Sequence, residues 1–361
     1  MIVAVVSDLH LGRGKFLRNG QHNILEDFDH DHSFDEFVDY FSDPQFEGQE
    51  IQLVLNGDIF NLIQIDLDGV FLPSITENIA LRSLHKIIEG HEVFFNALRK
   101  FNSNTKRSIV YVIGNHDSPM YWNKLQEAFT QQVGGDVEFC FSKNINGIHI
   151  EHGHRFEVIN AVPLKDYFTT GPTGEEVLNL PWGSLFCVTI LPSLKKRRPY
   201  IDRVRPTGLY IRWSLIYDFS FFLLMSFTVM RFVFQTLFQR YQEKKRDGLL
   251  SMIKLLKQIT VYPKYERQAK NIFRKNRDIH TVIMGHSHLR EWRRFPEDKF
   301  YFNTGTWTFI PSMNTAMHQN ELVLNYVMIE VDQGSNLVIK RSMNAWLGKW
   351  RPYRSDIVIN N

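Results

Sequence analysis

Short polar groups of aspartate, asparagine and histidine recur along this sequence, and all three residue types can bind a transition metal. The groups read DLH at 8–10, GD at 57–58, GNHD at 114–117, HG at 152–153 and GHSH at 285–288. Imidazole nitrogen and carboxylate oxygen suit Mn²⁺, Fe and Zn²⁺, and a pair of such ions needs about seven or eight protein ligands. The sequence therefore predicts a two-metal centre with these ligands: Asp8, His10, Asp58, Asn115, His152, His286 and His288.

The spacing within the groups favours shared ions. Asp8 and His10 are separated by one residue, so both side chains turn to the same side of an extended backbone, and His286 and His288 repeat that spacing. Asp58 stands alone after a glycine, where its carboxylate can approach two ions at once. A single DxH occurs by chance, and a single GD is more often a turn with a helix cap. The prediction depends on all five groups occurring together.

Each polar group follows a short apolar segment that is typical of a buried β-strand. These apolar segments lie at 2–6, 51–55, 108–113, 148–151 and 280–284. Between the first three of them, residues 32–42 and 78–101 show helical spacing. Alternating strand and helix implies α/β units, in which ligands gather where the strands end. Further strands at 299–303, 323–331 and 337–341 alternate like an antiparallel tail. We therefore expect an α/β fold, an α+β sandwich with mixed sheets, in preference to a doubly wound sheet.

In this order, the five groups resemble the calcineurin-like metallophosphoesterase superfamily over about 1–155 and 279–310. The resemblance implies a four-layer-type core in which two mixed β-sheets are flanked by helices, with two divalent metal ions bound. Manganese is the expected metal, with iron or zinc as alternatives. The resemblance also divides the ligands: Asp8, His10 and His288 on one ion, Asn115, His152 and His286 on the other, and Asp58 as the bridge.

Phosphoester hydrolysis is the chemistry expected of such a centre. Two neighbouring cations lower the pKa of a bridging water enough to supply hydroxide near neutral pH, and they neutralise the phosphoryl oxygens. His116, inside GNHD, is the candidate to stabilise the transition state or protonate the leaving group. Asp117 either orients His116 or caps a following helix. Arg13 and Asn61 are candidates for substrate contact.

Other motifs bear on the substrate. The GDxxDRG and GNHE motifs of the protein serine/threonine phosphatases are absent, because IFN follows Asp58 and the third group ends in Asp117. NTGTW at 303–307 resembles the UDP-2,3-diacylglucosamine diphosphatase group, which cleaves a pyrophosphate in lipid A biosynthesis. That group usually has HGD where this chain has HGH, so no role is assigned to His154. The resemblance implies a pyrophosphatase or phosphodiesterase acting on a nucleotide-linked lipid such as UDP-2,3-diacylglucosamine.

Three alternatives stay open beside that interpretation. The DNA-repair nucleases of the superfamily share the DxHLG start found at 8–12, so a nuclease or nucleotide phosphodiesterase is one alternative. A non-catalytic, metal-binding scaffold at a membrane surface is a second. The third concerns Trp307 alone, which would pack under the edge of a sheet and carry no information on the substrate.

Residues 161–275 break the pattern and are interpreted as a helical, aromatic-rich insertion in a core of 1–160 and 276–361. Residues 219–230 are uncharged, but roughly 12 residues are too few to span a membrane, so no transmembrane helix is expected. Paired with 249–259, this apolar stretch would form a cap over the site. A lipid pocket, a membrane contact and a self-packed helical hairpin are the three interpretations of the insertion.

The charged residues bear on partners. A net charge of +3 suits a phosphorylated small-molecule or lipid-linked substrate but falls short of what a nucleic-acid binder needs. The basic run at 195–198, with Arg203 and Arg205, would contact anionic lipid headgroups, contact the substrate diphosphate, or form a solvated loop. We expect peripheral membrane contact through 195–240 and infer no obligate protein partner.

The cysteines and the first residues bear on location. Cys140 and Cys187 cannot form a disulfide framework, which favours a reducing compartment. The first residues are those of a β-strand and lack the basic start of a signal peptide. We therefore expect a cytoplasmic protein at the inner face of a membrane.

Overall fold

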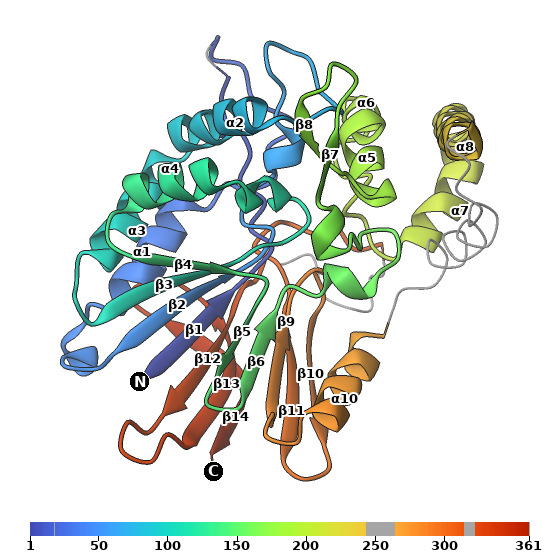
Figure 1. Cartoon of the computed structure of the whole chain (residues 1–361). Helices are drawn as coiled ribbons and strands as arrows, with labels where there is room; N and C mark the ends of the chain where they lie inside the picture. The colour runs from blue at the N-terminus through green and yellow to red at the C-terminus, as the bar shows by residue number, and fades with distance from the viewer. Residues whose placement is uncertain (18, 243–263, 314–321, 361) are drawn as a thin grey trace.

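The computed structural model describes residues 1–17, 19–242, 264–313 and 322–360. Two β-sheets pack against each other, and helices cover their outer faces (Figure 1). The chain combines helices with two mixed sheets, so the prediction of an α/β fold with mixed sheets is confirmed.

The larger sheet has seven strands in the order β14-β13-β12-β1-β2-β3-β4. Strands β1 to β4 are parallel, and β12, β13 and β14 extend the sheet in antiparallel fashion, as the sequence predicts for the tail. Their bounds are β1 Ile2–Val6, β2 Ile51–Asn56, β3 Arg107–Val112, β4 Val137–Cys140, β12 Leu324–Val331, β13 Val338–Trp346 and β14 Tyr353–Asn360.

The smaller sheet has five strands in the order β10-β11-β9-β6-β5. Its three inner strands are parallel, and an antiparallel strand lies at each edge. The bounds are β5 Ser142–Ile145, β6 Ile148–Glu151, β9 Thr281–Met284, β10 Arg290–Phe295 and β11 Lys299–Thr304. The sequence missed β4, β5, β10 and β14, whose residues are largely half-exposed and lack a continuous apolar run.

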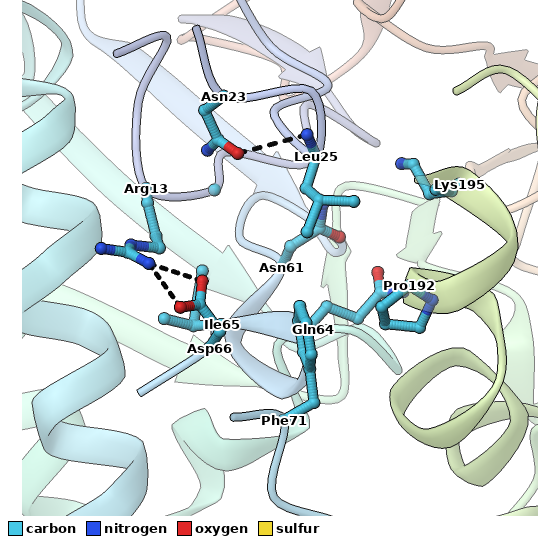
Figure 2. Close-up of a pocket in the computed structure, with 11 residues that line it drawn as sticks. Arg13, Asn23, Leu25, Asn61, Gln64, Ile65, Asp66, Phe71, Pro192 and Lys195 are labelled. Carbon is cyan, nitrogen blue, oxygen red and sulfur yellow. Dashed lines mark hydrogen bonds and ion pairs between the residues drawn. The ribbon is translucent and has the colours of Figure 1, made fainter. Parts of the chain in front are cut away.

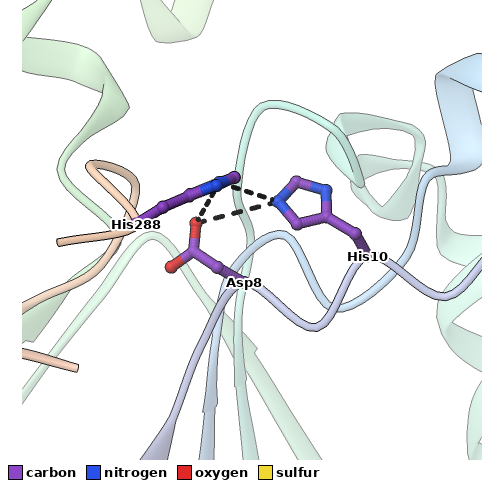
Figure 3. Close-up of side chains that lie close together, drawn as sticks. All are labelled: Asp8, His10 and His288. Carbon is purple, nitrogen blue, oxygen red and sulfur yellow. Dashed lines mark hydrogen bonds and ion pairs between the residues drawn. The ribbon is translucent and has the colours of Figure 1, made fainter. Parts of the chain in front are cut away.

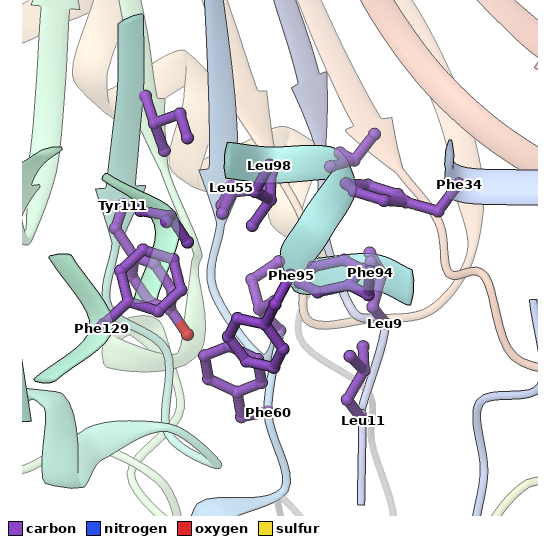
Figure 4. Packing of buried hydrophobic residues seen from close by; sticks show 14 of the residues in the cluster. Leu9, Leu11, Phe34, Leu55, Phe60, Phe94, Phe95, Leu98, Tyr111 and Phe129 are labelled. Atoms are coloured by element: carbon purple, nitrogen blue, oxygen red, sulfur yellow. The ribbon is translucent and has the colours of Figure 1, made fainter. Parts of the chain in front are cut away.

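Strand β1 shows how one segment serves two packing layers. Val3 and Val5 belong to the cluster between the sheets, whereas Ala4 and Val6 belong to the cluster beneath the helices, because successive side chains point to opposite faces. Figure 4 shows aromatic rings of that helix-side cluster, from segments far apart in the chain. The helices on this side are α1 Asp31–Tyr40, α2 Glu77–Gly90, α3 Glu92–Asn102 and α4 Asn123–Val133, and α10 Tyr265–Lys275 packs on the outer face of the smaller sheet.

The helical character expected over 78–101 is confirmed, but the stretch forms two helices, because helical geometry is interrupted between α2 and α3. A Cβ at Gly90 would overlap the backbone carbonyl of Arg13, so the α2 end lies directly on the loop after β1. His91 leaves helical geometry, and its Nδ1 lies 2.9 Å from the Asp31 carboxylate. The helical periodicity of the sequence continues through this break. The break itself is caused by the tertiary contacts of Gly90 and His91.

Among its described residues, the insertion at 161–275 contains a small hairpin, helices α5 to α8 and helix α10, and short 3-10 turns mark loops of the described chain. Leu178, Leu180 and Val188 pack into the helix-side cluster of the larger sheet, so the predicted domain boundaries stay a prediction. The bounds are β7 Phe168–Thr170, β8 Glu176–Leu178, α5 Trp182–Thr189, α6 Leu191–Lys195, α7 Thr207–Tyr217 and α8 Phe219–Gln242, with 3-10 turns η1 Pro44–Phe46, η2 Leu62–Gln64, η3 Ser118–Tyr121, η4 His154–Phe156 and η5 Leu164–Asp166.

Helix α8 is longer than the uncharged stretch that the sequence shows. It runs without a break past Arg231, so the length argument against a membrane-spanning helix was wrong. Its window Phe219–Thr236 has a mean hydropathy of 1.4 and is long and apolar enough to cross a membrane, by length and composition only. The predicted partner segment 249–259 lies outside the described residues.

Candidate metal centre

The predicted ligands lie where the central strands of both sheets end. Two lie just after β1, one each after β2, β3 and β6, and two after β9. Five of these residues have a positive φ, which costs a non-glycine residue on the order of 1 kcal/mol and is typical of functional sites. They are Asp8, His10, Asp58, His286 and His288.

Three glycines are required by the close approach of the ligands. A Cβ at Gly57 would overlap the His152 ring, and a Cβ at Gly114 would overlap the Asp58 carboxylate. A Cβ at Gly285 would overlap the side chains of Ser7 and Asp8. The glycine that opens each GD, GN and GH group therefore gives space to a ligand from another strand. This reason is invisible in the motif itself.

Asp8, His10 and His288 converge as one ligand group, within 4.8 Å of one another (Figure 3). The Nε2 atoms of the two imidazoles are 3.0 Å apart, and Asp8 Oδ1 is 3.3 Å from Nε2 of His288 and 3.9 Å from Nε2 of His10. Two imidazole nitrogens that face each other beside a buried carboxylate need a cation or a proton between them. This donor set suits a first-row divalent metal.

Asp58, His152 and His286 form a second such group. Nε2 of His152 lies 3.1 Å from Asp58 Oδ2, and the rings of the two histidines are 5.2 Å apart. Asn115 Oδ1 is buried and has no hydrogen-bond partner within the described part of the chain, as a free ligand atom would be. The residues of this group therefore fit a divalent ion, and the division of all seven ligands between two ions stays a prediction.

The electrostatics keep the carboxylates of this centre ionised. Burial opposes the charge of Asp58, but the positive charge of His152 outweighs it and holds the Asp58 pKa well below its usual value. His152 and His288 act in the same way on the Asp8 pKa. Burial likewise disfavours charged His152, yet Asp58 and Asp8 raise its pKa to about 10. A site with this charge pattern attracts and retains cations.

Asn61 orients two histidines. Its side-chain oxygen lies 2.8 Å from Nδ1 of His10 and 3.0 Å from Nδ1 of His116, and its amide nitrogen donates to the His10 carbonyl. Because an amide oxygen only accepts, both rings carry a proton on Nδ1, which leaves Nε2 of His10 free to bind a metal. Asn61 therefore positions these rings, and its predicted contact with substrate stays a prediction.

His116 lies as close to the metal ligands as they lie to one another. Its backbone N–H donates to Asp58 Oδ1 over 2.8 Å, and its ring forms a third candidate group with His10 and Asp58. Burial lowers the pKa of His116 to about 3, so the ring is neutral in the absence of bound ligands. His116 therefore belongs to the same cluster as the predicted ligands, and its catalytic role stays a prediction.

Asp117 has neither of the roles expected for it. Oδ2 accepts from the Ile59 N–H and the Tyr111 hydroxyl, and Oδ1 accepts from the Gly114 N–H. These bonds use both oxygens, so Asp117 does not orient His116, and it makes no side-chain cap to η3. Burial and the nearby Asp58 charge raise the Asp117 pKa to about 6. The residue holds together the turns that follow β2 and β3.

Sequence reasoning missed Glu157. Its Oε2 lies 2.9 Å from Nε2 of His286, and its Oε1 accepts a hydrogen bond of 2.6 Å from the Tyr265 hydroxyl. A carboxylate on one ring nitrogen fixes the orientation of a histidine and makes the other nitrogen a better metal ligand. His154 lies beside this group: its ring centroid is 5.4 Å from that of His152, and its Nδ1 is buried without a hydrogen-bond partner among the described residues.

Arg13 lines a pocket beside Asn61, together with Gln64, Pro192 and Lys195 (Figure 2). Its Nη1 lies 2.6 and 2.5 Å from the two carboxylate oxygens of Asp66. A phosphate would have to compete with that carboxylate, so the geometry does not favour the predicted phosphate contact of Arg13. The pocket lies between the core and the insertion, next to the first ligand group.

The NTGTW segment supports the ligand turns and does not face the pocket. Asn303 donates to the Gly285 carbonyl over 2.7 Å, and Thr306 donates to the Asp8 carbonyl over 2.5 Å. Trp307 is fully buried against Phe34 and Phe37. The alternative in which Trp307 packs inside the protein is confirmed, so this motif does not identify the substrate.

No family model matches this chain, and no curated protein matches it. Among solved structures, a Vps29 mutant from Entamoeba histolytica is 11% identical, with 100% of this chain and 99% of that chain covered and a TM-score of 0.32. A predicted phosphoesterase from Streptococcus pneumoniae is 10% identical, with 100% and 97% covered and a TM-score of 0.31. Wild-type Vps29 complexed with Zn²⁺, from Entamoeba histolytica, is 17% identical over 28% of this chain and 49% of that chain, with a TM-score of 0.19. Likenesses this distant decide neither family nor activity, so the site has to be judged by its own geometry.

Proposed function

We propose that this chain is a metal-dependent phosphoesterase with a dinuclear centre. The observation that carries the proposal is the convergence of the His10 and His288 Nε2 atoms, 3.0 Å apart, beside the buried Asp8 carboxylate. The second group, around Asp58, lies next to the first, because Asp8 accepts the backbone N–H of His286 over 2.9 Å. Manganese is the proposed metal, with iron and zinc as alternatives.

The residues around the ions have separate tasks. Bound ions of this kind supply a hydroxide near neutral pH and neutralise a phosphoryl group. Asn61 fixes the ring of His116 through its Nδ1–H, so donation from Nε2 requires the imidazolium form. The negative charge of a bound phosphate raises the pKa of a neighbouring histidine and favours that form. His116 would then stabilise the phosphoryl oxygens or protonate the leaving group.

The proposed substrate is a nucleotide-linked lipid such as UDP-2,3-diacylglucosamine. Support comes from the insertion, which lines the pocket beside Asn61 through Pro192 and Lys195 and exposes many apolar side chains on α7 and α8. An amphiphile would place its phosphates at the metal ligands and its acyl chains toward the insertion. The net charge of +3 gives little support to a nuclease. The proposed location is the cytoplasmic face of a membrane.

Hydrolysis assays test the activity and the substrate separately. The protein is stripped with EDTA, reloaded with Mn²⁺, and given bis(p-nitrophenyl) phosphate or UDP-2,3-diacylglucosamine. We expect turnover only with metal. His288→Asn should lose both metal and turnover, whereas His85→Asn, an exposed histidine on α2, should keep both.

Each negative outcome excludes a different claim. Bound metal without turnover of either substrate would replace the enzyme by a metal-binding scaffold. Turnover of the small diester alone would exclude the lipid substrate. Cleavage of single- or double-stranded DNA, with binding that weakens steeply as salt rises, would favour the nuclease.

A further inference from the structure

Helix α8 carries an exposed apolar stripe along one side. The exposed side chains of this stripe are large, and two of them, Phe227 and Phe234, are 62% and 64% exposed. The spacing of four, four, three and four residues keeps all five within about 80° around the helix axis and spreads them over about 22 Å of its length. We call this set the α8 stripe: Phe219, Leu223, Phe227, Met230 and Phe234.

The opposite side of α8 packs on the insertion. Phe232 contacts Trp182 and Phe186 of α5, with ring centroids 5.2 and 5.7 Å apart, and Phe221 lies under the Arg198 guanidinium at 5.0 Å. Phe221 and Phe232 are three turns apart and share one face. They hold the helix lengthwise against the protein, and this orientation directs the α8 stripe outward.

Helix α7 adds to the same outer region. Ile216 and Tyr217 are 70% and 73% exposed, and Trp213 and Leu215 are exposed beside them. Figure 1 shows α7 and α8 together on the side of α5 and α6 that faces away from α2 and α4. Two neighbouring helices thus expose a run of large apolar side chains, which soluble surfaces rarely carry without a partner.

Among the described residues, the charges on these helices that have no partner are positive. From 206 to 236 the charged residues are Arg212, Asp218 and Arg231, and Asp218 pairs with Arg198 over 2.6 Å. Both arginines are exposed, and Arg231 lies one turn after Phe227, at the edge of the α8 stripe. Long basic side chains beside an apolar face are typical of helices at an anionic lipid surface.

Some cations of the basic cluster at 195–198, Arg203 and Arg205 are paired inside the protein and cannot contact lipid. Lys195 is buried, and its ammonium lies 2.8 Å from Asp27 and 3.3 Å from Asp202. Arg203 is also buried and lies 2.8 Å from Asp27. These two cations hold the insertion on the core, whereas Lys196 and Arg197 of the same run are exposed.

We infer that α7 and the α8 stripe dock the protein on an anionic lipid bilayer, with α8 parallel to the membrane plane. The apolar rings enter the region between headgroups and acyl chains, and Arg212 and Arg231 reach the phosphates. An amphipathic helix at a membrane usually has a polar side in water. In α8 the side opposite the stripe is instead packed against α5. This docking does not depend on the proposed catalytic function.

Vesicle binding by the full chain tests the apolar part. The probes are sedimented vesicles of phosphatidylcholine alone and of phosphatidylcholine with 30% phosphatidylglycerol. Phe227→Glu and Phe234→Glu should each lower partitioning roughly tenfold to a hundredfold, as loss of one buried ring does. The matched control is Leu337→Glu, an equally exposed apolar residue in the turn between β12 and β13, which should bind like the wild type.

Charge substitution tests the electrostatic part. Arg212→Gln with Arg231→Gln should reduce binding to the anionic vesicles by roughly 25-fold, about fivefold for each charge, and should leave the neutral vesicles unaffected. Added salt should weaken the wild type toward the level of this variant. An equal loss on both vesicle types would contradict headgroup recognition.

Three results would overturn the docking. Absence of vesicle binding, with a fall in melting temperature for the glutamate variants, would mean that another part of this chain covers the α8 stripe. Absence of vesicle binding with a dimer that Phe227→Glu dissociates, measured by light scattering, would assign the stripe to a second copy. Resistance to alkaline carbonate extraction would mean that α8 crosses the bilayer.

Discussion

The candidate functional side chains are buried at the metal centre and exposed in the α7–α8 region. At the centre, Asp8 and Asp58 are buried, and the backbone at both has an unfavourable positive φ that the packed strand ends impose. On α8, the backbone is regular and the apolar side chains are exposed. Buried, strained acidic side chains suit the proposed ions, whereas exposed apolar side chains suit the proposed lipid surface. Strain and exposure thus favour two different kinds of partner.

The largest expected effect is at the bridge. Asp58→Asn should reduce phosphodiesterase turnover by roughly 10³-fold or more and lower metal occupancy, because a neutral amide cannot hold two cations. His116→Ala should reduce the rate and spare the metals. Turnover and metal content by atomic emission are the measurements, with Asp68→Asn, an exposed aspartate, as the control. A metal-free His116→Ala protein would assign His116 as a ligand.

A matched pair of phenylalanines tests the contrast in packing. Phe60 is fully buried among aromatic rings, and Phe227 is 62% exposed. Phe60→Ala should lower the free energy of unfolding by about 3 to 5 kcal/mol, and Phe227→Ala should change it by no more than about 0.5 kcal/mol. Urea unfolding measures both. A large effect at Phe227 would mean that the folded chain itself covers this residue.

The pH dependence of the free energy of unfolding tests how His91 and Glu26 hold the loop at Gly12 and Gly14. Asp31 and Glu26 raise the pKa of buried His91 to about 9, against the desolvation that opposes its charge, and Glu26 also accepts the Gly12 and Gly14 N–H groups. A raised folded pKa contributes stability that is complete below about pH 6.5 and is lost as pH rises through about 9. The loss should be on the order of 3 kcal/mol.

Unfolding curves between pH 6 and pH 10 check this expectation. His91→Gln should flatten the dependence across that interval, whereas His85→Gln, on the exposed side of α2, should retain it. An unchanged slope in His91→Gln would show that another group titrates.

The smallest expected effect is at Glu157. Glu157→Gln should weaken Mn²⁺ binding about tenfold to a hundredfold, because the amide orients His286 less firmly and does not increase its basicity. Isothermal titration calorimetry measures the affinity, and Glu127→Gln, an exposed glutamate on α4, is the control. If the affinity is unchanged but the melting temperature falls, the Glu157 contact is structural only.

The sequence predicted most of the central strands, and it placed the candidate ligands at the strand ends, for a common reason. In DLH, GD, GNHD and GHSH the ligand directly follows its strand, so local order places it at the sheet end. Strands β4, β5, β10 and β14 escaped because their exposed residues carry no apolar run. The break at His91 escaped because a side-chain contact to another helix causes it.

What the sequence alone determined is the identity of the candidate ligands, since each lies beside an apolar strand whose burial fixes its direction. The tertiary structure decided the partners of those ligands. Asn61 and Glu157 reach the histidines from distant segments, Tyr265 donates in turn to Glu157, and no spacing along the chain encodes such contacts. It also decided which charges and apolar groups remain at the surface: Lys195 is buried against Asp27, whereas the α8 stripe is exposed. Burial depends on what the folded chain brings near, and composition does not record it.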